Sequence, residues 1–433
     1  MVLLINRRGI DMNRVNTNEI SIQFSQTKVE YEHWKEKRLN LNMARGKPGH
    51  QQLVLVSGLF QALTDPEDCM DSGIDAANYG QLAGLPSARK LFAELLCCRP
   101  EQVFVGGNSS LTLMYDTIAK AMLHGLLHSV TPWSRQDNLK WLCPCPGYDR
   151  HFRITQSFSF ELIPVPMTPS GPDMDLVERL IQDPTVKGMW NVPKYSNPQG
   201  IVYSAQTIHR LAAMKPAAPD FLLMWDNAYC VHDFEEVLPS EDILALSAQY
   251  GNADMVFEYA STSKITVPGA GISCFACSEA NLNYLLPVLD VQVISYDKIN
   301  QLRHVRYLKD KSHVLELMKQ HAAILKPRFD LVVDILGREI APLGLAHWNR
   351  PKGGYFVSVD TLPGLAKRTV QLCRQAGVII TEAGATFPYG IDPNDQNIRL
   401  APSYPSVAEL QQAMEVFCCC LKYAAFEQMN KTT

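Results

Sequence analysis

Short apolar runs that end in small or polar residues recur along the first two thirds of the chain. Runs of this kind are typical of parallel strands that are buried on both faces. They predict strands at residues 102–105, 141–143, 160–165, 187–193, 221–225, 255–260 and 271–278. Apolar residues at helical spacing predict helices between them, for example from Pro86 to Leu96 and over residues 204–214.

The two ends of the chain carry a different pattern. Residues 18–40 predict an N-terminal helix, and residues 298–340 predict a long helical region rich in Lys and Arg. Three further strands and two helices are predicted near the C-terminus, at residues 353–359, 363–376, 377–380, 397–401 and 406–428. No internal repeat or low-complexity linker interrupts this order.

Strands that alternate with helices form a mostly parallel sheet covered on both faces. The sequence therefore predicts an α/β protein. Its large domain has three α/β/α layers around a mixed, mostly parallel sheet of seven strands, and a smaller α/β domain follows. The expected boundaries are an N-terminal helix and arm at 1–50 that packs with the small domain, a large domain at 51–310, and a small domain at 311–433.

Composition narrows the class of protein. The chain has 433 residues, of which 46% are hydrophobic and 19% charged, and its net charge is −4. This balance offers no general attraction to nucleic acid or to an anionic membrane, and no apolar run approaches the roughly 18 residues of a membrane span. The N-terminus does not resemble a secretory signal. Most of the twelve cysteines are expected to be small buried residues in a reducing compartment, so a cytoplasmic protein is expected.

Polar or glycine-rich segments follow four of the predicted strands. They are the turn at residues 106–110, Asn197, Asp226 and Lys264. In parallel sheets ligands bind beyond the carboxyl ends of the strands, so this shared placement indicates one site. A strand, a glycine turn and a helix start form a geometry that binds phosphate.

Each of these residues also has an ordinary structural interpretation. Lys264 could be a surface lysine, residues 106–110 an ordinary turn, and Asp226 a helix cap. Tyr148 could pack on the core, and Arg399, between Ile398 and Leu400, could be a solvated strand residue. The order of the whole set, rather than any one member, favours a site.

That ordered set resembles the fold-type-I pyridoxal-phosphate aminotransferases, from about residue 42 to residue 425. The similarity rests on the following residues: Tyr79, Gly107-Asn108-Ser109, Asn197-Pro198-x-Gly200, Asp226-x-x-Tyr229, Ser261-x-x-Lys264 and Arg399. The segments 44–48, 78–80, 106–111 and 146–152 resemble the divergent aspartate aminotransferase branch called MocR-type or subgroup Ic.

The resemblance implies pyridoxal 5′-phosphate as cofactor and gives each residue a role. Lys264 would form the internal aldimine and shuttle the proton, and Asp226 would pair with the pyridinium nitrogen. Tyr229 and Asn197 would bond the phenolic oxygen, and Tyr148 would stack on the ring. The implied phosphate ligands are Gly107, Asn108, Ser109 and Ser261, with Tyr79 from a neighbouring subunit of a homodimer. Arg399 would bind the substrate α-carboxylate, with Asn197 and the Arg45-Gly46 segment also at the substrate.

One feature departs from the family pattern. Better-known branches carry an arginine about eight residues after the lysine, bonded to the phosphate, whereas this chain has Gly269-Ala270-Gly271-Ile272 there. Lys298 and Asn300, contributed by the partner subunit or by the same one, are the candidates to replace it. Arg45, Lys47 and Arg150 are candidates for a substrate side-chain carboxylate.

The expected reaction is ping-pong transfer of an amino group from an amino acid, aspartate or glutamate, to a 2-oxo acid such as 2-oxoglutarate. A pyridoxal-phosphate lyase, decarboxylase or racemase is the alternative, because one fold supports several reactions. A non-catalytic effector domain of a MocR-type regulator is a remote alternative. About 40 residues precede the first motif, which is too few for a winged helix-turn-helix.

Overall fold

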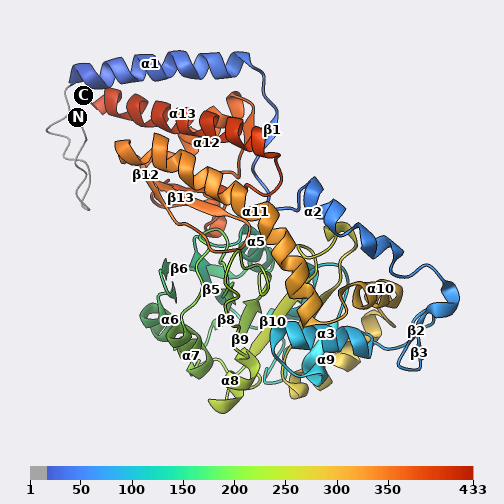
Figure 1. The fold of residues 1–433 in the computed structure, drawn as a ribbon. Coiled ribbons are helices and arrows are strands. Elements are labelled where there is room, and N and C mark those ends of the chain that lie inside the picture. The colour runs from blue at the N-terminus through green and yellow to red at the C-terminus, as the bar shows by residue number, and fades with distance from the viewer. Residues whose placement is uncertain (1–16, 433) are drawn as a thin grey trace.

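An eight-stranded sheet forms the centre of the larger part of the molecule (Figure 1). The computed structural model describes residues 17–432. The sheet order is β4 (Val103–Val105), β11 (Ser273–Ala276), β10 (Val256–Ser261), β9 (Leu222–Asp226), β8 (Val186–Asn191), β5 (Lys140–Cys145), β6 (Glu161–Thr168) and β7 (Gly171–Pro172). Only β11 and β7 run antiparallel to their neighbours in this sheet. The predicted α/β fold is confirmed, with the two-residue edge strand β7 added to the seven predicted strands.

Helices cover both faces of the sheet, so the central strands are buried on both sides. Every residue of β8 and β9 is buried. One face packs against helices α3 (Pro86–Leu96), α6 (Met174–Leu180), α7 (Ala205–Ala213) and α8 (Ile243–Gln249). The other face packs against α4 (Ser110–His124), α5 (Asp149–Ser157) and α9 (Glu279–Gln292). These are the three layers that the sequence predicts.

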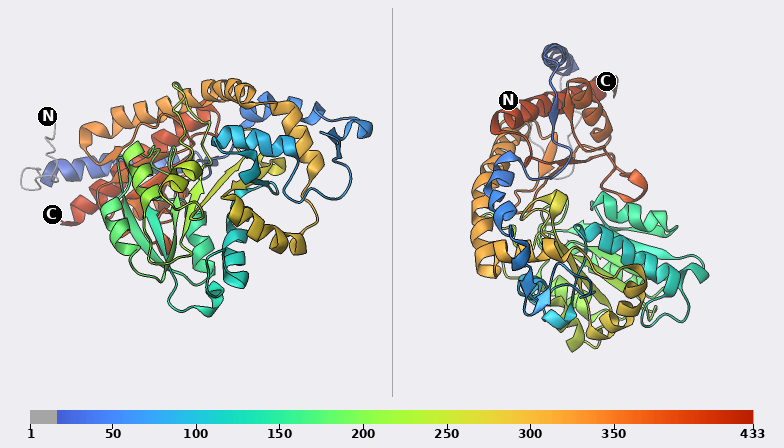
Figure 2. Two further views of the ribbon diagram at one scale, coloured as in Figure 1. Left: turned by 90° about the horizontal axis from the view of Figure 1, so that it is seen from below. Right: turned by 90° about the vertical axis from the view of Figure 1, so that its right-hand side faces the viewer.

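The C-terminal part has its own sheet and core. Strands β12 (Ala346–Trp348), β13 (Val357–Thr361) and β15 (Asn397–Leu400) form an antiparallel sheet beside α12 (Ala366–Gln375) and α13 (Val407–Thr432). Helix α1 (Thr17–Glu36) lies along α13, as Figures 1 and 2 show, and Tyr31 stacks on Tyr423 at 5.1 Å between ring centres. The predicted domain boundaries near residues 50 and 310 stay predictions.

Two details differ from the sequence analysis. The region expected as one helix over 298–340 is two helices, α10 (Lys298–Leu308) and α11 (Lys311–Glu339). The chain turns at Lys309, where φ is +59°, and the Asp310 carboxylate caps α11 by accepting from the His313 amide. Strand β14 (Val378–Ile379) pairs in parallel with β1 (Leu41–Asn42) of the N-terminal arm and stays outside the β12–β13–β15 sheet.

All twelve cysteines are free thiols, and all except Cys97 and Cys98 are buried. This confirms that they are core residues rather than a disulfide framework. Within residues 17–432, every helix is too short or too polar to span a bilayer.

Candidate active site

The residues predicted from the strand ends meet at one edge of the sheet. Strands β10, β9, β8 and β5 are parallel neighbours, so their carboxyl ends lie together. Lys264 follows β10, Asp226 ends β9, Asn197 lies in the buried loop after β8, and Tyr148 follows β5. The sheet therefore brings side chains that are far apart in sequence to one place.

Lys264 is half-buried between two aromatic rings. Its Nζ lies 5.1 Å from the ring centre of Tyr229 and 5.7 Å from that of Tyr355. Burial lowers the pKa of the ammonium below the ordinary lysine value, and the negative charge of Asp226 opposes that shift. A lysine in such a place becomes a neutral amine, and thus a nucleophile and base, at lower pH than a surface lysine.

Asp226 is a buried carboxylate, and one of its two oxygens has a hydrogen-bond partner. Its Oδ2 lies 3.0 Å from Nε2 of His151, while its Oδ1 is buried and has no hydrogen-bond partner among the described residues. The ring of His151 stacks on Trp190 at 4.4 Å and meets the edge of Tyr148 at 4.9 Å. Because a buried carboxylate oxygen without a donor is costly, Asp226 is suited to a ligand that brings a donor.

The start of helix α5 positions three side chains of this cluster. Tyr148 is the N-cap of the helix, and Asp149 and His151 follow in its first turn. The chain can enter this turn because residue 147 is glycine. A Cβ there would lie 2.4 Å from the Pro144 carbonyl oxygen. Burial, together with the charge of Asp149, raises the pKa of the Tyr148 hydroxyl to about 12, so the ring stays neutral.

Arg399 reaches the same place from β15 of the small sheet. Its Nη1 donates to Oδ1 of Asp149 at 2.9 Å and to Oδ1 of Asn197 at 3.2 Å, and its Nε points to Thr381 Oγ1 at 3.4 Å. The guanidinium carbon lies 4.9 Å from the ring centre of Phe356. Arg399 therefore points inward, where it pairs with the Asp149 carboxylate, and it is not a solvated strand residue.

The N-terminal arm lies beside Arg399. The Thr381 hydroxyl donates to the Ala44 carbonyl oxygen at 2.7 Å, and a Cβ on Gly46 would lie 2.6 Å from the Phe356 ring. Gly46 therefore allows close approach of the arm to the ring that covers Arg399. Arg45 is exposed and forms no salt bridge with the described residues.

The glycine turn after β4 is linked to the end of β10 through β11, which lies between the two strands. Ser273 of β11 pairs with Ser261, and its amide and hydroxyl each donate to the Gly107 carbonyl oxygen at 2.8 Å. Ser109 is the N-cap of the fifteen-residue helix α4, yet its hydroxyl makes no capping bond. Helix N-termini with available hydroxyls bind phosphate groups well.

Three predicted residues lie outside this cluster or are engaged elsewhere. Tyr79 is 81% exposed, in a loop before α3. Lys298 is buried, and its Nζ donates to the carbonyl oxygens of Asn78 and Gly80, on either side of Tyr79. Asn300 donates to the carbonyl oxygens of Ala270 and Gly271 at 3.0 and 3.1 Å. Their predicted roles at a phosphate stay predictions.

The structure adds residues that sequence reasoning did not assign. His151 and Asp149 contact Asp226 and Arg399, and the only sequence signal was their place in the helix turn that starts with Tyr148. His232 is buried beside Tyr229 and Tyr355, and neither of its ring nitrogens has a hydrogen-bond partner among the described residues. Burial, and then the positive charge of Lys264, lowers its pKa well below the usual histidine value, so its ring is neutral.

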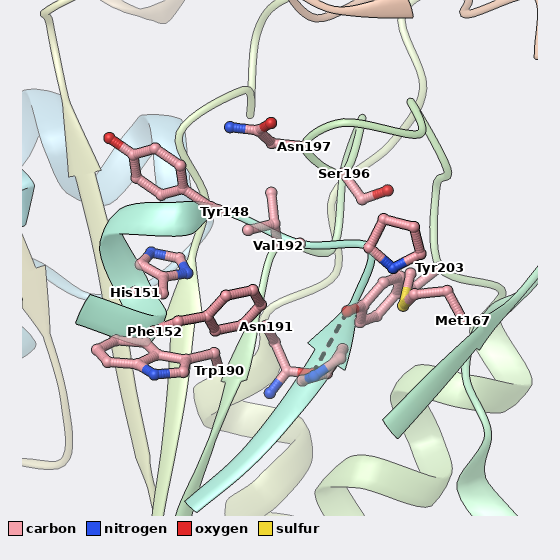
Figure 3. A pocket seen from close by; sticks show the side chains of 13 residues that line it. Tyr148, His151, Phe152, Met167, Trp190, Asn191, Val192, Ser196, Asn197 and Tyr203 are labelled. Atoms are coloured by element: carbon pink, nitrogen blue, oxygen red, sulfur yellow. Dashed lines mark hydrogen bonds between the residues drawn. The ribbon is translucent and has the colours of Figure 1, made fainter. Parts of the chain in front are cut away.

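A small cavity adjoins this cluster. Figure 3 shows Tyr148 and His151 on one side of it and Ser196 and Asn197, from the loop after β8, on another. Its volume is about 20 Å³, and Asn191 Nδ2 in its lining has no hydrogen-bond partner among the described residues. A space of this size with a polar wall holds about one water molecule.

Comparison with known proteins gives consistent results. A family model described as aspartate amino-transferase matches residues 15–432. An aspartate aminotransferase of Corynebacterium glutamicum is 42% identical over 420 residues, which cover 97% of each chain. The crystal structure of an aspartate transaminase from Corynebacterium glutamicum has a TM-score of 0.94 at 42% identity, over 96% of this chain and 99% of that one.

A more distant structure shows the fold alone. The α-aminoadipate aminotransferase LysN of Thermus thermophilus, complexed with N-(5′-phosphopyridoxyl)-L-leucine, has a TM-score of 0.71 at 20% identity. The match covers 89% of this chain and 93% of that one.

Proposed function

The chain belongs to the aspartate aminotransferase family, and from this premise we propose that it uses pyridoxal 5′-phosphate to move amino groups between aspartate or glutamate and a 2-oxo acid such as 2-oxoglutarate. One observation carries the proposal. Lys264, which lies between the rings of Tyr229 and Tyr355, is at the same sheet edge as the buried carboxylate of Asp226, and one oxygen of that carboxylate has no donor among the described residues. The amino donor and acceptor are proposed from the name of the relative in Corynebacterium glutamicum.

The residues present fit this cofactor. The unpartnered Oδ1 of Asp226 is the acceptor that a protonated ring nitrogen needs, and His151 holds the other oxygen. The α4 N-terminus would take the phosphate through Gly107, Asn108 and the Ser109 hydroxyl, with Ser261 beside it. When bound, the cofactor supplies an electron sink that stabilises negative charge at the substrate Cα.

Lys264 is the proposed nucleophile and base. As a neutral amine, Lys264 would hold the cofactor through its Nζ. Once the substrate amine has taken its place, Lys264 would accept the proton released from the substrate Cα and pass it on to the cofactor. Tyr229 and Asn197 would orient the ring through its phenolic oxygen, and Tyr148 would cover one face. Burial raises the pKa of the Tyr229 hydroxyl well above its ordinary value, so this hydroxyl remains a hydrogen-bond donor.

Arg399 is the proposed anchor of the substrate α-carboxylate, because its fork of donors matches a carboxylate. Its position between the Phe356 ring and Asn197 fixes the guanidinium. Arg45, with Gly46, is proposed at the substrate side chain, since the arm packs against Phe356.

We also propose a homodimer with shared sites. Tyr79 is a large exposed aromatic residue, and Lys298 fixes the backbone on both sides of it. A fixed, exposed side chain of this kind suits contact with a second copy, where Tyr79 would reach the phosphate of the neighbouring site. Leu123 and Val291, at the ends of α4 and α9, are 68% and 90% exposed and would be covered in such a dimer.

The half-reaction tests the proposed function. Aspartate added to the enzyme loaded with pyridoxal 5′-phosphate should give oxaloacetate and pyridoxamine 5′-phosphate in equal amounts, and 2-oxoglutarate should then regenerate the starting form. Mass spectrometry and the loss of the visible cofactor band measure both products. Alanine, carbon dioxide or racemised aspartate without pyridoxamine 5′-phosphate would instead identify a lyase, decarboxylase or racemase.

A further inference from the structure

The proposed carboxylate anchor already holds a carboxylate of this chain. Nη1 of Arg399 has two hydrogens, and they point to Asp149 at 2.9 Å and Asn197 at 3.2 Å. Nε points to the Thr381 hydroxyl at 3.4 Å, while Nη2 makes no hydrogen bond with any described residue. A carboxylate that binds in two-pronged fashion needs two neighbouring donors. Both the Nη1–Nη2 pair and the Nε–Nη2 pair therefore include a nitrogen that already donates a hydrogen bond.

Of the three groups on Arg399, Asp149 is the one able to leave. Thr381 is tied to the Ala44 carbonyl oxygen, and Asn197 lies in a buried loop. The Asp149 side chain is 25% exposed, whereas that of Arg399 is 7% exposed. Asp149 also lies in the first turn of α5, where the unpaired amides and the helix dipole stabilise a carboxylate that has left its arginine.

Charge makes simultaneous occupation unfavourable. A substrate carboxylate beside Asp149 on one guanidinium would place two negative charges a few ångströms apart in a partly buried site. In the absence of substrate, the Asp149 carboxylate forms an ion pair with Arg399. Without this partner, burial of the guanidinium charge would be unfavourable.

We propose that Asp149 is an internal occupant of the substrate-carboxylate position on Arg399, and that each substrate displaces it on binding. This inference rests on the proposed function, in which Arg399 binds the α-carboxylate. It makes Asp149 a residue that sets affinity for amino acid and 2-oxo acid alike. Because the displaced carboxylate leaves the reacting atoms, its effect falls on KM rather than on kcat.

The test is the affinity of the loaded enzyme for maleate, a carboxylate that cannot react. Calorimetry of Asp149→Asn should give a maleate Kd about two- to fivefold lower than that of the wild type, the range expected for loss of a partly exposed ion pair. The KM values for aspartate and 2-oxoglutarate should fall with it, with kcat within about twofold. Asp149→Ser provides the same measurement if the Asn variant folds poorly, and Asp149→Glu, which keeps the charge, should remain near wild type.

Asp175→Asn is the matched control. Asp175 also lies in the first turn of a helix and pairs with an arginine, Arg210, at 2.7 Å. Its substitution should leave maleate binding unchanged. If maleate binds Asp149→Asn equally or more weakly, Asp149 merely orients Arg399 and the inference is overturned, while the proposed function stands. If the loaded wild type neither binds maleate nor transaminates aspartate, both are overturned.

Discussion

Nε2 of His151 lies 3.0 Å from Oδ2 of Asp226, and both side chains are buried. An ionised carboxylate only accepts, so Nε2 carries the proton and donates. This bond fixes the direction of the carboxylate and leaves Oδ1 without a partner in the part of the chain that the structure describes. Stacking on Trp190 in turn fixes the imidazole.

Replacement of His151 by phenylalanine should weaken cofactor binding. The ring can still stack on Trp190, but Asp226 loses a hydrogen bond to a charged group, which contributes about 1.5–3 kcal/mol. The Kd for pyridoxal 5′-phosphate should therefore rise about tenfold to a hundredfold, measured by fluorescence titration of the apoenzyme. His128→Phe is the control, since His128 pairs with Asp254 at 2.8 Å on the surface. Equal Kd values for His151→Phe and wild type would contradict the proposed role of Asp226.

Lys264→Ala should abolish transamination, with a fall in the half-reaction rate of about a thousandfold or more, because nucleophile and base are lost together. Lys90→Ala, at an exposed position of α3, should leave the rate unchanged. Stopped-flow absorbance after mixing with aspartate measures both. A Lys264→Ala variant that retains wild-type turnover would refute the proposal.

The lowered pKa of Lys264 gives a separate test by pH. Its neutral fraction rises as pH rises through that pKa, so uptake of pyridoxal 5′-phosphate by the apoenzyme should accelerate with a midpoint below the ordinary lysine value of 10.5. The rate of appearance of the visible band at a series of pH values measures this midpoint. A midpoint at or above 10.5 would show that the burial of the amine has no such effect.

The parts of this site that the sequence could predict are those set by local pattern. Apolar runs predict buried strands, and residues such as Asp226 and Lys264 can be placed at a common edge because parallel strands end together. Contacts between distant segments leave no such local signal. Asp149 meets Arg399 across 250 residues, and Asn300 bonds the Gly271 carbonyl rather than standing unengaged. The sequence does not predict the break at Lys309, because Lys is an ordinary helix residue, and the Asp310 cap shows it in the structure.

Subunit complementation tests the proposed role of Tyr79. Tyr79→Ala and Lys264→Ala should each be nearly inactive alone, since one affects the neighbouring site and the other its own. If Tyr79 serves the neighbouring subunit, random mixing should restore about a quarter of the sites, because each hybrid dimer then has one intact site. Turnover after joint refolding or co-expression measures this. No gain on mixing would mean that Tyr79 acts within its own subunit or not at all.

Glu258 gives a prediction for stability rather than catalysis. It is fully buried in β10, its Oε1 accepts from Asn227 Nδ2 at 2.9 Å, and its Oε2 has no hydrogen-bond partner among the described residues. Burial raises its pKa from 4.5 to about 8, against the lowering effect of the Asn227 bond. The folded protein therefore holds a proton on Glu258 at neutral pH, where the unfolded chain has released it.

The sign of the pH dependence follows. The contribution of Glu258 to the free energy of unfolding is fully present below pH 4.5 and is lost as pH rises toward about 8. Over this range the free energy of unfolding falls by at most about 1.4 kcal/mol per pH unit. Glu258→Gln keeps the acceptor for Asn227 and cannot ionise, so its stability should exceed that of the wild type increasingly from pH 5 to pH 8. Denaturant unfolding at several pH values measures the difference, with Glu67→Gln, at an exposed position, as the control. Because only ionisation of Glu258 separates the two proteins, parallel pH profiles for wild type and Glu258→Gln would mean that the carboxyl ionises normally in the folded state.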